Sequence, residues 1–238
     1  ILRKKGQKIA AKRGDNDAKE GVILAQTTGD GKAGVILTLN CETDFVAKNE
    51  GYVSLVQSLI NKALENLPES VEALKALSYD DKLSIDEKIT EQIGVIGEKL
   101  DLSGYAVLRG DKVVAYNHPG NQLATLVVLN SASETASEAG RQVAMQVAAM
   151  NPIAVTKDGV DSRTIEREVE IGKELAIQEG KAPDMAEKIA LGRLNKFFQE
   201  NTLLSQQFVR DNKLTVEQFL NTTENGLTVT DFRRFSLS

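Results

Sequence analysis

Two runs of β-forming residues, separated by a tight glycine turn, constrain most strongly what this chain can fold into. Within "EGVILAQTTGDGKAGVILTLNCE" the runs cover residues 22–27 and 34–40. The Gly-Asp-Gly turn between them contains Gly29 and Gly31, and glycine adopts positive φ angles without steric cost. This pattern predicts a β-hairpin. A helical pattern follows at once, so we expect the second strand to lead directly into a helix.

The residues after the hairpin predict a long amphipathic helix that ends near Pro68. Thr43 is placed to cap its N-terminus, and Asp44 falls in the first turn, where the helix dipole favours a negative charge. The buried face is expected from apolar side chains at steps of three and four residues: Val53, Val56, Ile60, Ala63 and Leu64. Phe45 lies about two turns before this face begins. Because a phenylalanine is usually buried, Phe45 by itself favours a core position that fastens the helix to the sheet. An exposed anchor for a partner protein is the alternative.

Further along, the patterns predict a second helix, a second hairpin, a buried strand and an alanine-rich helix. The helix begins at Ser84, whose capping partner is Glu87, and its buried face is expected from Ile85, Ile89, Ile93, Ile96 and Leu100. The remaining elements are the hairpin of residues 105–108 and 113–116 joined through 109–112, the strand 123–130 and the helix 135–149. Strands and helices come in separate groups and not in βαβ alternation, so we predict an α+β fold.

The region from residue 162 to residue 201 differs in character, because two highly charged helical patterns flank the sequence "EGKAP". Their apolar seams are thin, and the residues expected in them are Ile165, Val169 and Ala176 on one side and Ala186, Ala190, Phe197 and Phe198 on the other. Such seams predict an antiparallel helical hairpin, inserted within a domain, that pairs with something else. A short helix and a final strand follow, and this strand must return to a sheet to satisfy its backbone.

Composition limits the classes of function. The chain has 238 residues, enough for two modest domains. It has no apolar run near the roughly 20 residues that span a bilayer, and its N-terminus lacks the pattern of a secretory signal. We therefore expect a cytoplasmic protein, or one of an organelle matrix. A net charge of -5 argues against nucleic-acid binding. The basic residues of the first segment have no aromatic residue among them and are expected on a solvated helix face: Arg3, Lys4, Lys5, Lys8, Lys12 and Arg13.

No motif in the sequence predicts catalysis. Cys41 and His118 are the single cysteine and the single histidine, so neither a disulfide framework nor a cysteine zinc cluster is available. Nucleophilic catalysis needs a thiol beside a base, and a thiol hydrolase built on these two residues is one alternative. A cysteine at the end of a buried strand is more often a small apolar side chain. The glycine turn precedes a strand and not a helix, so it does not predict a phosphate loop. We expect no cofactor and no metal, and a binding protein is favoured over an enzyme.

The stretch "NCETDFVAKNEG" closely resembles the signature of the elongation factor Ts family, the guanine-nucleotide exchange factors for elongation factor Tu in bacterial-type translation. Its segment "TDFVAKN", residues 43–49, fits that signature nearly residue for residue. The resemblance covers the whole chain through further matches: "IGEKLDL" at 96–102, "YNHPG" at 116–120, "MQVAAMNP" at 145–152 and "GRLNKFF" at 192–198.

This resemblance implies two α+β subdomains, each an antiparallel sheet with helices, and an inserted antiparallel coiled-coil hairpin. The implied division is a basic helix and linker at 1–19 remaining from an N-terminal helical module, a first subdomain at 20–111, a second at 112–158 with 206–238, and the hairpin at 159–205. The chain starts with Ile1 and not with Met, so we expect that N-terminal module to be missing. The hairpin resembles a dimerisation element, which implies a homodimer or a 2:2 complex as one outcome.

The resemblance also implies a function: binding elongation factor Tu in its GDP-bound and nucleotide-free states, displacing magnesium and promoting GDP release. Asp44 and Phe45 would then form an exposed tip, with Phe45 wedged between helices of Tu's nucleotide domain. The other residues implied at this contact are Thr43, Val46, Ile96, Gly97 and His118. No catalytic residue, cofactor, direct nucleic-acid contact or membrane contact is implied. A scaffold that acts through the helical hairpin is the second alternative to exchange.

Overall fold

The computed structural model of the chain describes residues 2–237, which form two compact units. One unit contains the residues up to Ala132 together with those from Asp231, and the other contains Ser133–Thr230. Helices and antiparallel sheets occupy separate stretches, so the architecture is α+β, as predicted. The four-part division of the chain stays a prediction, and the compact units divide the chain elsewhere.

The first sheet is built on the hairpin that the sequence predicts. Its strands are antiparallel and lie in the order β1 (Glu20–Thr27), β2 (Ala33–Cys41) and β3 (Asp101–Arg109). Glu20 lies opposite Cys41, and Thr27 lies opposite Gly34. The turn uses Gly31 at a φ of 69°, a value that only glycine adopts freely. β2 is the central strand, and it carries buried side chains on both faces of the sheet.

The predicted hairpin of residues 105–108 and 113–116 is wrong. β3 pairs with β2, whereas β4 (Lys112–Asn117) pairs with β5 (Leu123–Leu129). β8 (Val229–Ser236) completes this second sheet in the order β4-β5-β8, so the final strand returns to a sheet as predicted. The error has a physical reason: a turn brings two strands close together but does not decide which neighbours complete their backbone hydrogen bonds.

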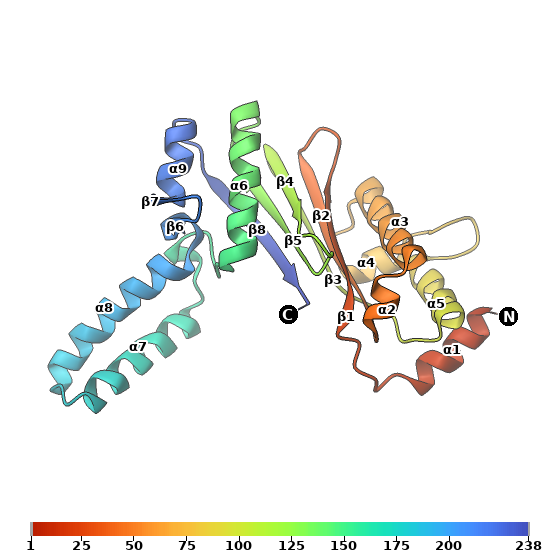
Figure 1. Cartoon of the computed structure of the whole chain (residues 1–238), viewed down its shortest axis with the longest axis horizontal. Coiled ribbons are helices and arrows are strands. Elements are labelled where there is room, and N and C mark those ends of the chain that lie inside the picture. The colour runs from red at the N-terminus through yellow and green to blue at the C-terminus, as the bar shows by residue number, and fades with distance from the viewer. Residues whose placement is uncertain (1, 238) are drawn as a thin grey trace. The chain divides into compact units, whose positions relative to one another are not determined.

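Two apolar cores hold the first unit together. One lies between the sheets and contains Ile23, Ala25, Ile36, Leu108, Val113, Ala124, Leu126 and Val128. The other covers the opposite face of the first sheet, where the helices α3 (Glu50–Asn66), α4 (Val71–Ala76) and α5 (Ile85–Ile96) gather (Figure 1). Every second side chain of β2 therefore faces these helices, and the rest face the second sheet.

The helix faces follow the predicted periodicity, with local corrections. In α3, Val56, Ile60 and Ala63 are buried, whereas Val53 and Leu64 are half-buried. The capping box of Ser84 and Glu87 starts α5 as predicted. The helix ends at Ile96, so Leu100 is buried from the segment that follows and not from the helix itself.

The basic N-terminal helix α1 (Leu2–Lys12) packs on α5 at a glycine crossing. A Cβ atom added to Gly6 would lie 1.9 Å from the carbonyl oxygen of Thr90, and one added to Gly94 would lie 2.4 Å from that of Leu2. The two helices therefore meet backbone to backbone. Arg3 and the lysines of α1 are exposed, as expected for a solvated face. Arg13, predicted on the same face, follows the helix, is half-buried and pairs with Glu42.

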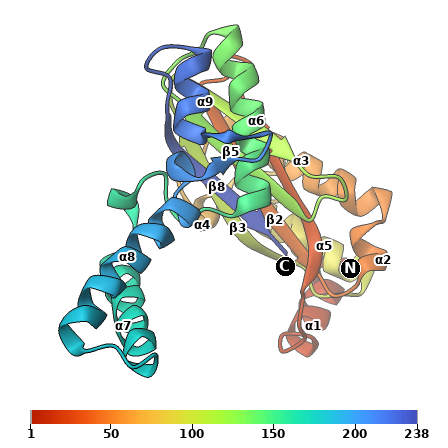
Figure 2. The same ribbon diagram turned by 60° about the vertical axis from the view of Figure 1, so that its left-hand side comes forward.

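The second unit carries the helical hairpin. Its elements are α6 (Glu134–Met150), the 3-10 turns η1 (Lys157–Gly159) and η2 (Leu203–Ser205), α7 (Ser162–Gln178), α8 (Pro183–Asn201), β6 (Gln207–Phe208), β7 (Asp211–Thr215) and α9 (Val216–Thr223). Figures 1 and 2 show α7 and α8 side by side, projecting from the rest of this unit. They are antiparallel, with ion pairs from Lys173 to Glu187 and from Arg193 to Glu179.

Small residues close the seam of this hairpin. Its buried residues are Gly172, Ala176, Ala186, Ala190 and Leu194, and a Cβ added to Gly172 would lie 3.1 Å from Cα of Ala190. The predicted seam residues Ile165, Val169, Phe197 and Phe198 are only half-buried. A helical hairpin is confirmed, and its coiled-coil winding stays a prediction. None of the helices in the described part of the chain combines the length and the apolar character that a bilayer crossing needs.

Candidate protein-interaction tip

The candidate site lies at the end of β2, where a separate helix of a single turn precedes the long helix that the sequence predicts. This helix, α2 (Asp44–Ala47), has Lys48 as its C-cap, and α3 begins after a second cap at Asn49. The Asn49 side chain accepts hydrogen bonds from the backbone N–H groups of Gly51 (2.9 Å) and Tyr52 (3.3 Å). The prediction of one continuous helix is wrong because an asparagine at this position competes for these N–H groups and restarts the helix.

Phe45 projects from this single turn into solvent, with 83% of its surface exposed. The core position that its residue type favours is therefore wrong. Val46 and Ala47 point the other way and pack against the core under α3. The turn thus has an apolar inner side that fixes it and an aromatic outer side that faces solvent. We call residues 43–46 the tip.

Asp44, the neighbour of Phe45, is also on the outside of the turn. Its Oδ2 atom lies 2.7 Å from Nζ of Lys48. The hydrogen bond from Lys48, followed by the positive charge of the same residue, lowers the pKa of the Asp44 carboxyl. Asp44 therefore stays ionised at neutral pH and presents a negative charge next to the exposed ring.

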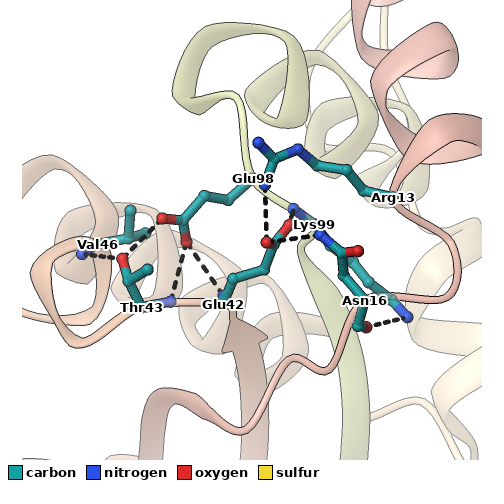
Figure 3. A network of polar contacts seen from close by, with 7 residues as sticks. All are labelled: Arg13, Asn16, Glu42, Thr43, Val46, Glu98 and Lys99. Carbon is teal, nitrogen blue, oxygen red and sulfur yellow. Dashed lines mark hydrogen bonds and ion pairs between the residues drawn. The ribbon is translucent and has the colours of Figure 1, made fainter.

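Thr43 caps α2 as predicted and is itself held by Glu98 (Figure 3). Its Oγ1 accepts a hydrogen bond from the N–H of Val46 (3.4 Å) and donates one to Oε1 of Glu98 (2.7 Å). The other oxygen, Oε2 of Glu98, accepts the backbone N–H groups of Glu42 and Thr43, both at 3.1 Å. One carboxylate therefore satisfies the backbone and the side chain at the base of the tip.

Glu42 makes a second set of contacts, on the other side of the same junction (Figure 3). Its Oε1 accepts the backbone N–H of Lys99 (2.7 Å), and its Oε2 accepts from Arg13 (2.7 Å) and Asn16 (2.9 Å). Burial alone would raise the pKa of Glu42, but the hydrogen bonds from Lys99, Asn16 and Arg13 outweigh it, and the net shift is downward. The side chain is only 13% exposed and remains charged.

Ile96 and Gly97 lie at the point where α5 ends. Ile96 is half-buried and packs into the core under α3, whereas the preceding Val95 is 55% exposed. Gly97 caps the helix in the left-handed region, at a φ of 85°, which favours glycine. This turn redirects the chain so that Glu98 reaches Thr43. The predicted pair Ile96 and Gly97 is thus joined to the tip through Glu98.

Several residues of this network escape sequence reasoning: Arg13, Asn16, Glu42, Glu98 and Lys99. They come from segments far apart in the chain, and no periodicity links them. A faint signal exists in "IGEKLDL", where a charged residue follows a helix-ending glycine directly.

The alternative of a thiol hydrolase does not survive the geometry. Cys41 is fully buried on the helix-covered face of the first sheet, and its thiol donates to the carbonyl oxygen of Thr43 (3.3 Å). Burial raises the pKa of the Cys41 thiol to about 11, so the nucleophilic thiolate is scarce at neutral pH. His118 is exposed in the loop between β4 and β5, in the second sheet, where its Nδ1 lies 2.9 Å from the hydroxyl of Tyr116. The required thiol and base are therefore on different layers.

The last residue of β4 and the loop after it, which carries His118, cover part of the free edge of β1. The Asn117 side chain accepts the N–H of Ala25 (2.8 Å) and donates to the carbonyl of the same residue (2.9 Å), and Asn121 O accepts the N–H of Ile23 (2.7 Å). His118 is thus held on an element separate from the tip. Among the described residues, no group of His, Cys, Asp and Glu is arranged to hold a metal ion.

The sequence similarity to known proteins includes the candidate site and most of the rest of the chain. A family model described as "Elongation factor TS" matches residues 42–238. The "Elongation factor Ts" of Amoebophilus asiaticus is 50% identical over 235 residues, which cover 98% of this chain and 84% of that protein. That of Porphyromonas gingivalis is 46% identical over 238 residues, 100% of this chain and 85% of the relative. The one from Chloroherpeton thalassium is 41% identical over 236 residues, 97% and 82% of the respective chains.

Proposed function

We propose that the exposed Phe45 drives nucleotide exchange, starting from the family to which the chain belongs. The chain is a member of the elongation factor Ts family, and it is on that ground a nucleotide exchange factor for elongation factor Tu in translation elongation. The observation that carries this proposal is the 83% exposure of an aromatic side chain on a single helical turn whose base is held by hydrogen bonds. Exposed aromatic side chains on a rigid support are typical anchors of protein interfaces.

Exchange by such a factor follows from thermodynamic linkage. A protein that binds nucleotide-free Tu more tightly than GDP-bound Tu must weaken GDP binding by the same coupling free energy. Burying a side chain of this size contributes about 1.5–3 kcal/mol. Since each 1.4 kcal/mol changes an equilibrium constant about tenfold, Phe45 alone can weaken GDP binding by about 10- to 100-fold if it is buried only in the nucleotide-free complex.

The proposed mechanism is steric. Phe45 inserts between helices of Tu's nucleotide domain and shifts groups that hold the magnesium ion and the phosphates. Magnesium requires nearly ideal octahedral geometry, so a small displacement is enough to weaken its site. Loss of the ion leaves the diphosphate charge uncompensated and favours release of GDP. No covalent bond is made or broken by the exchange factor.

The other tip residues have supporting roles in this proposal. Thr43 and Val46 fix the turn, one through the cap and one through its apolar contact. Asp44 provides a charge beside the ring. Ile96, Gly97 and His118 are proposed to line the same contact with Tu, and their part in binding rests on the family resemblance. The core's second part is proposed to contact Tu at a distance from the tip.

The helical hairpin supports a separate proposal, self-association to a homodimer or a 2:2 complex with Tu. Its helices leave large apolar side chains exposed: Ile171, Leu175, Ile177, Met185 and Leu191. We propose that this surface is not needed for exchange itself, in contrast to a scaffold that works only through the hairpin. We also propose action in a bacterial-type cytoplasm, without direct nucleic-acid contact.

The test is a release assay with Tu loaded with a fluorescent GDP analogue and chased with unlabelled GDP. Amounts of the chain well below those of Tu should accelerate release, because an exchange factor turns over. A matched variant lacking residues 162–201, closed by a short glycine linker, should keep most of the acceleration. No acceleration by the intact chain would refute the exchange function, and loss only in the deletion variant would favour the scaffold.

A further inference from the structure

We infer that Glu42 and Glu98 form a reciprocal clamp that positions Phe45 for exchange, and that Arg13 and Asn16 of the N-terminal segment are part of this support. The inference rests on the proposed function for its effect on exchange. It assigns these four residues positioning roles, through hydrogen bonds at the base of the tip, and not a direct contact with the partner.

The need for a clamp follows from the size of α2. This helix has four residues, and the backbone bonds that close it are Ala47 N–H to Thr43 O (3.2 Å) and Lys48 N–H to Asp44 O (3.0 Å). A first helical turn is unfavourable by itself because several dihedral angles are fixed for a single hydrogen bond. The turn that carries Phe45 must therefore be stabilised by contacts from outside.

The clamp is reciprocal because each glutamate binds the backbone beside the other. The carboxylate of Glu98 accepts the N–H groups of Glu42 and Thr43, and the carboxylate of Glu42 accepts the N–H of Lys99, the residue after Glu98. Both are charge-assisted contacts, which are stronger than neutral ones. The junction after β2 and the segment after α5 are thereby fastened to each other in two directions, as Figure 3 shows.

The N-terminal segment closes the outer side of this clamp. Arg13 and Asn16 donate to Oε2 of Glu42. Lys99 extends its side chain to the same segment, where Nζ donates to the carbonyl oxygens of Gly14 (2.6 Å) and Asn16 (3.1 Å). The two carboxylates are thus balanced by the charges of Arg13 and Lys99, so the clamp carries little net charge.

The helix before this segment, α1, is itself packed tightly on α5. α1 meets α5 backbone to backbone at Gly6 and Gly94, and α5 ends at the residue before Gly97, which turns the chain toward Glu98. Contacts therefore lead to the base of the tip both through Arg13, the residue that follows α1, and through α5, on which α1 packs. The N-terminal helix belongs to the support of Phe45 and does not act merely as a linker.

A held tip matters because an interface loses affinity when binding must first order a mobile side chain or loop. With the clamp in place, the ordering has already occurred in the free protein. Without it, the ring samples many directions, and only a fraction of encounters with the partner is productive.

The first experiment measures the tip without any partner. The chain contains four tyrosines but no tryptophan, so Phe45→Trp places a single indole at the tip, which can be excited selectively over the tyrosines. Time-resolved anisotropy of this variant should show a ring that moves mainly with the whole protein. Adding Glu98→Ala should introduce a large fast component, and adding Arg13→Ala a smaller one. Glu98→Gln should restore most of the order, because its amide oxygen can accept the two N–H groups and its NH2 can donate to Thr43.

A matched control separates this effect from a general loss of an ion pair. Glu69→Ala removes a pair with Arg109 elsewhere in the same unit, and it should leave the anisotropy of the indole in the Phe45→Trp background unchanged. Circular dichroism and thermal unfolding identify any variant that has lost its fold, and Arg13→Ala, on the outside of the clamp, then carries the test. The inference is overturned if the anisotropy is unchanged in a folded Glu98→Ala variant. If that variant does not fold, an unchanged anisotropy in Arg13→Ala overturns it.

The second experiment measures GDP release from Tu with Phe45 intact. Glu98→Ala should lower the rate constant of catalysed release about tenfold, Arg13→Ala about threefold, and Glu98→Gln should stay within about threefold of the wild type, in line with the cost of ordering an interface segment. If the wild type does not accelerate release, the proposed function is refuted. The anisotropy experiment still tests whether the clamp orders the tip, because it needs no partner. If the wild type exchanges and the loosened variants exchange equally well, the positioning role is refuted.

Discussion

The hydroxyl of Thr43 donates a 2.7 Å hydrogen bond to Oε1 of Glu98, a residue 55 positions further along the chain. The same hydroxyl accepts the N–H of Val46 and so caps the helix that carries Phe45. A local cap is thereby tied to a distant element. The direction in which Phe45 points depends on this single side chain in two ways, through the start of its helix and through the anchor of that start.

The first prediction concerns the cap. Thr43→Val keeps the shape of the side chain but removes the hydroxyl, so it should reduce the free energy of unfolding by about 1–2 kcal/mol, the usual cost of losing an N-cap. Thr43→Ser keeps the hydroxyl and should cost less than about half of that. Urea unfolding of the two variants measures the difference. Equal stability of the valine and serine variants would show that the hydroxyl contributes nothing.

The second prediction concerns the ring itself. Phe45→Ala should change the free energy of unfolding by less than about 0.5 kcal/mol, because the ring is exposed and its removal opens no cavity. The same change should slow catalysed GDP release by at least about tenfold, as expected for loss of an aromatic anchor. Ile177→Ala, which truncates an exposed apolar residue on the hairpin, serves as the control. A Phe45→Ala variant that exchanges normally would remove Phe45 from the mechanism.

A third prediction concerns Cys41. With a pKa of about 11, the native thiol should react at about pH 8 at least roughly 100-fold more slowly than a free cysteine, since only the thiolate attacks. Burial should slow it further. Adding denaturant should release one equivalent of reactive thiol in a colorimetric thiol assay. Rapid labelling of the native protein would contradict both the burial and the raised pKa.

A fourth prediction follows from the lowered pKa of Glu42, whose carboxylate accepts hydrogen bonds from Arg13, from Asn16 and from the backbone N–H of Lys99. A carboxyl with a lower pKa in the folded state binds protons less readily there than in the unfolded chain. Its contribution to stability is therefore full above the unfolded pKa of about 4.3 and is lost as the pH falls through the lower, folded value.

Comparison of wild type and Glu42→Gln by chemical unfolding tests this sign. The wild type should be the more stable protein at about pH 7, and the gap should shrink as the pH falls below about 4. A gap of constant size over this range would show that the charge of Glu42 does not matter. A gap that widens in acid would reverse the sign and contradict the lowered pKa.

Local features of the fold could be predicted from the sequence because their causes are local. The capping box of Ser84 and Glu87 lies within one turn, and the hairpin of β1 and β2 is closed by its own glycine turn. The predicted turn at residues 109–112 misleads for the same reason. It shows that the chain reverses, but the partner of β3 is β2, from an earlier stretch, and pairing at that distance leaves no local trace.

In the candidate site, too, the features with local causes could be predicted and those with long-range causes could not. Thr43 could be predicted as a cap because a threonine hydroxyl directly before a helical pattern can accept a free backbone N–H of the first turn. The exposure of Phe45 could not be derived from its residue type, which favours burial, and it entered only through the family resemblance. Glu98 and Arg13 could not be predicted at all, since their partners become neighbours only after α1 and α5 have packed together.

The end of β4, together with the loop that carries His118, has a consequence for solubility. β1 lies at the edge of its sheet, and an open edge offers its backbone to strands of other molecules, which is a common start of aggregation. The amide of Asn117 pairs with the backbone of Ala25 as a neighbouring strand would, and the carbonyl of Asn121 takes the N–H of Ile23. At these positions β1 is closed to intermolecular strand addition. A chain without that amide would keep its fold and lose part of its protection against forming fibres with its own copies.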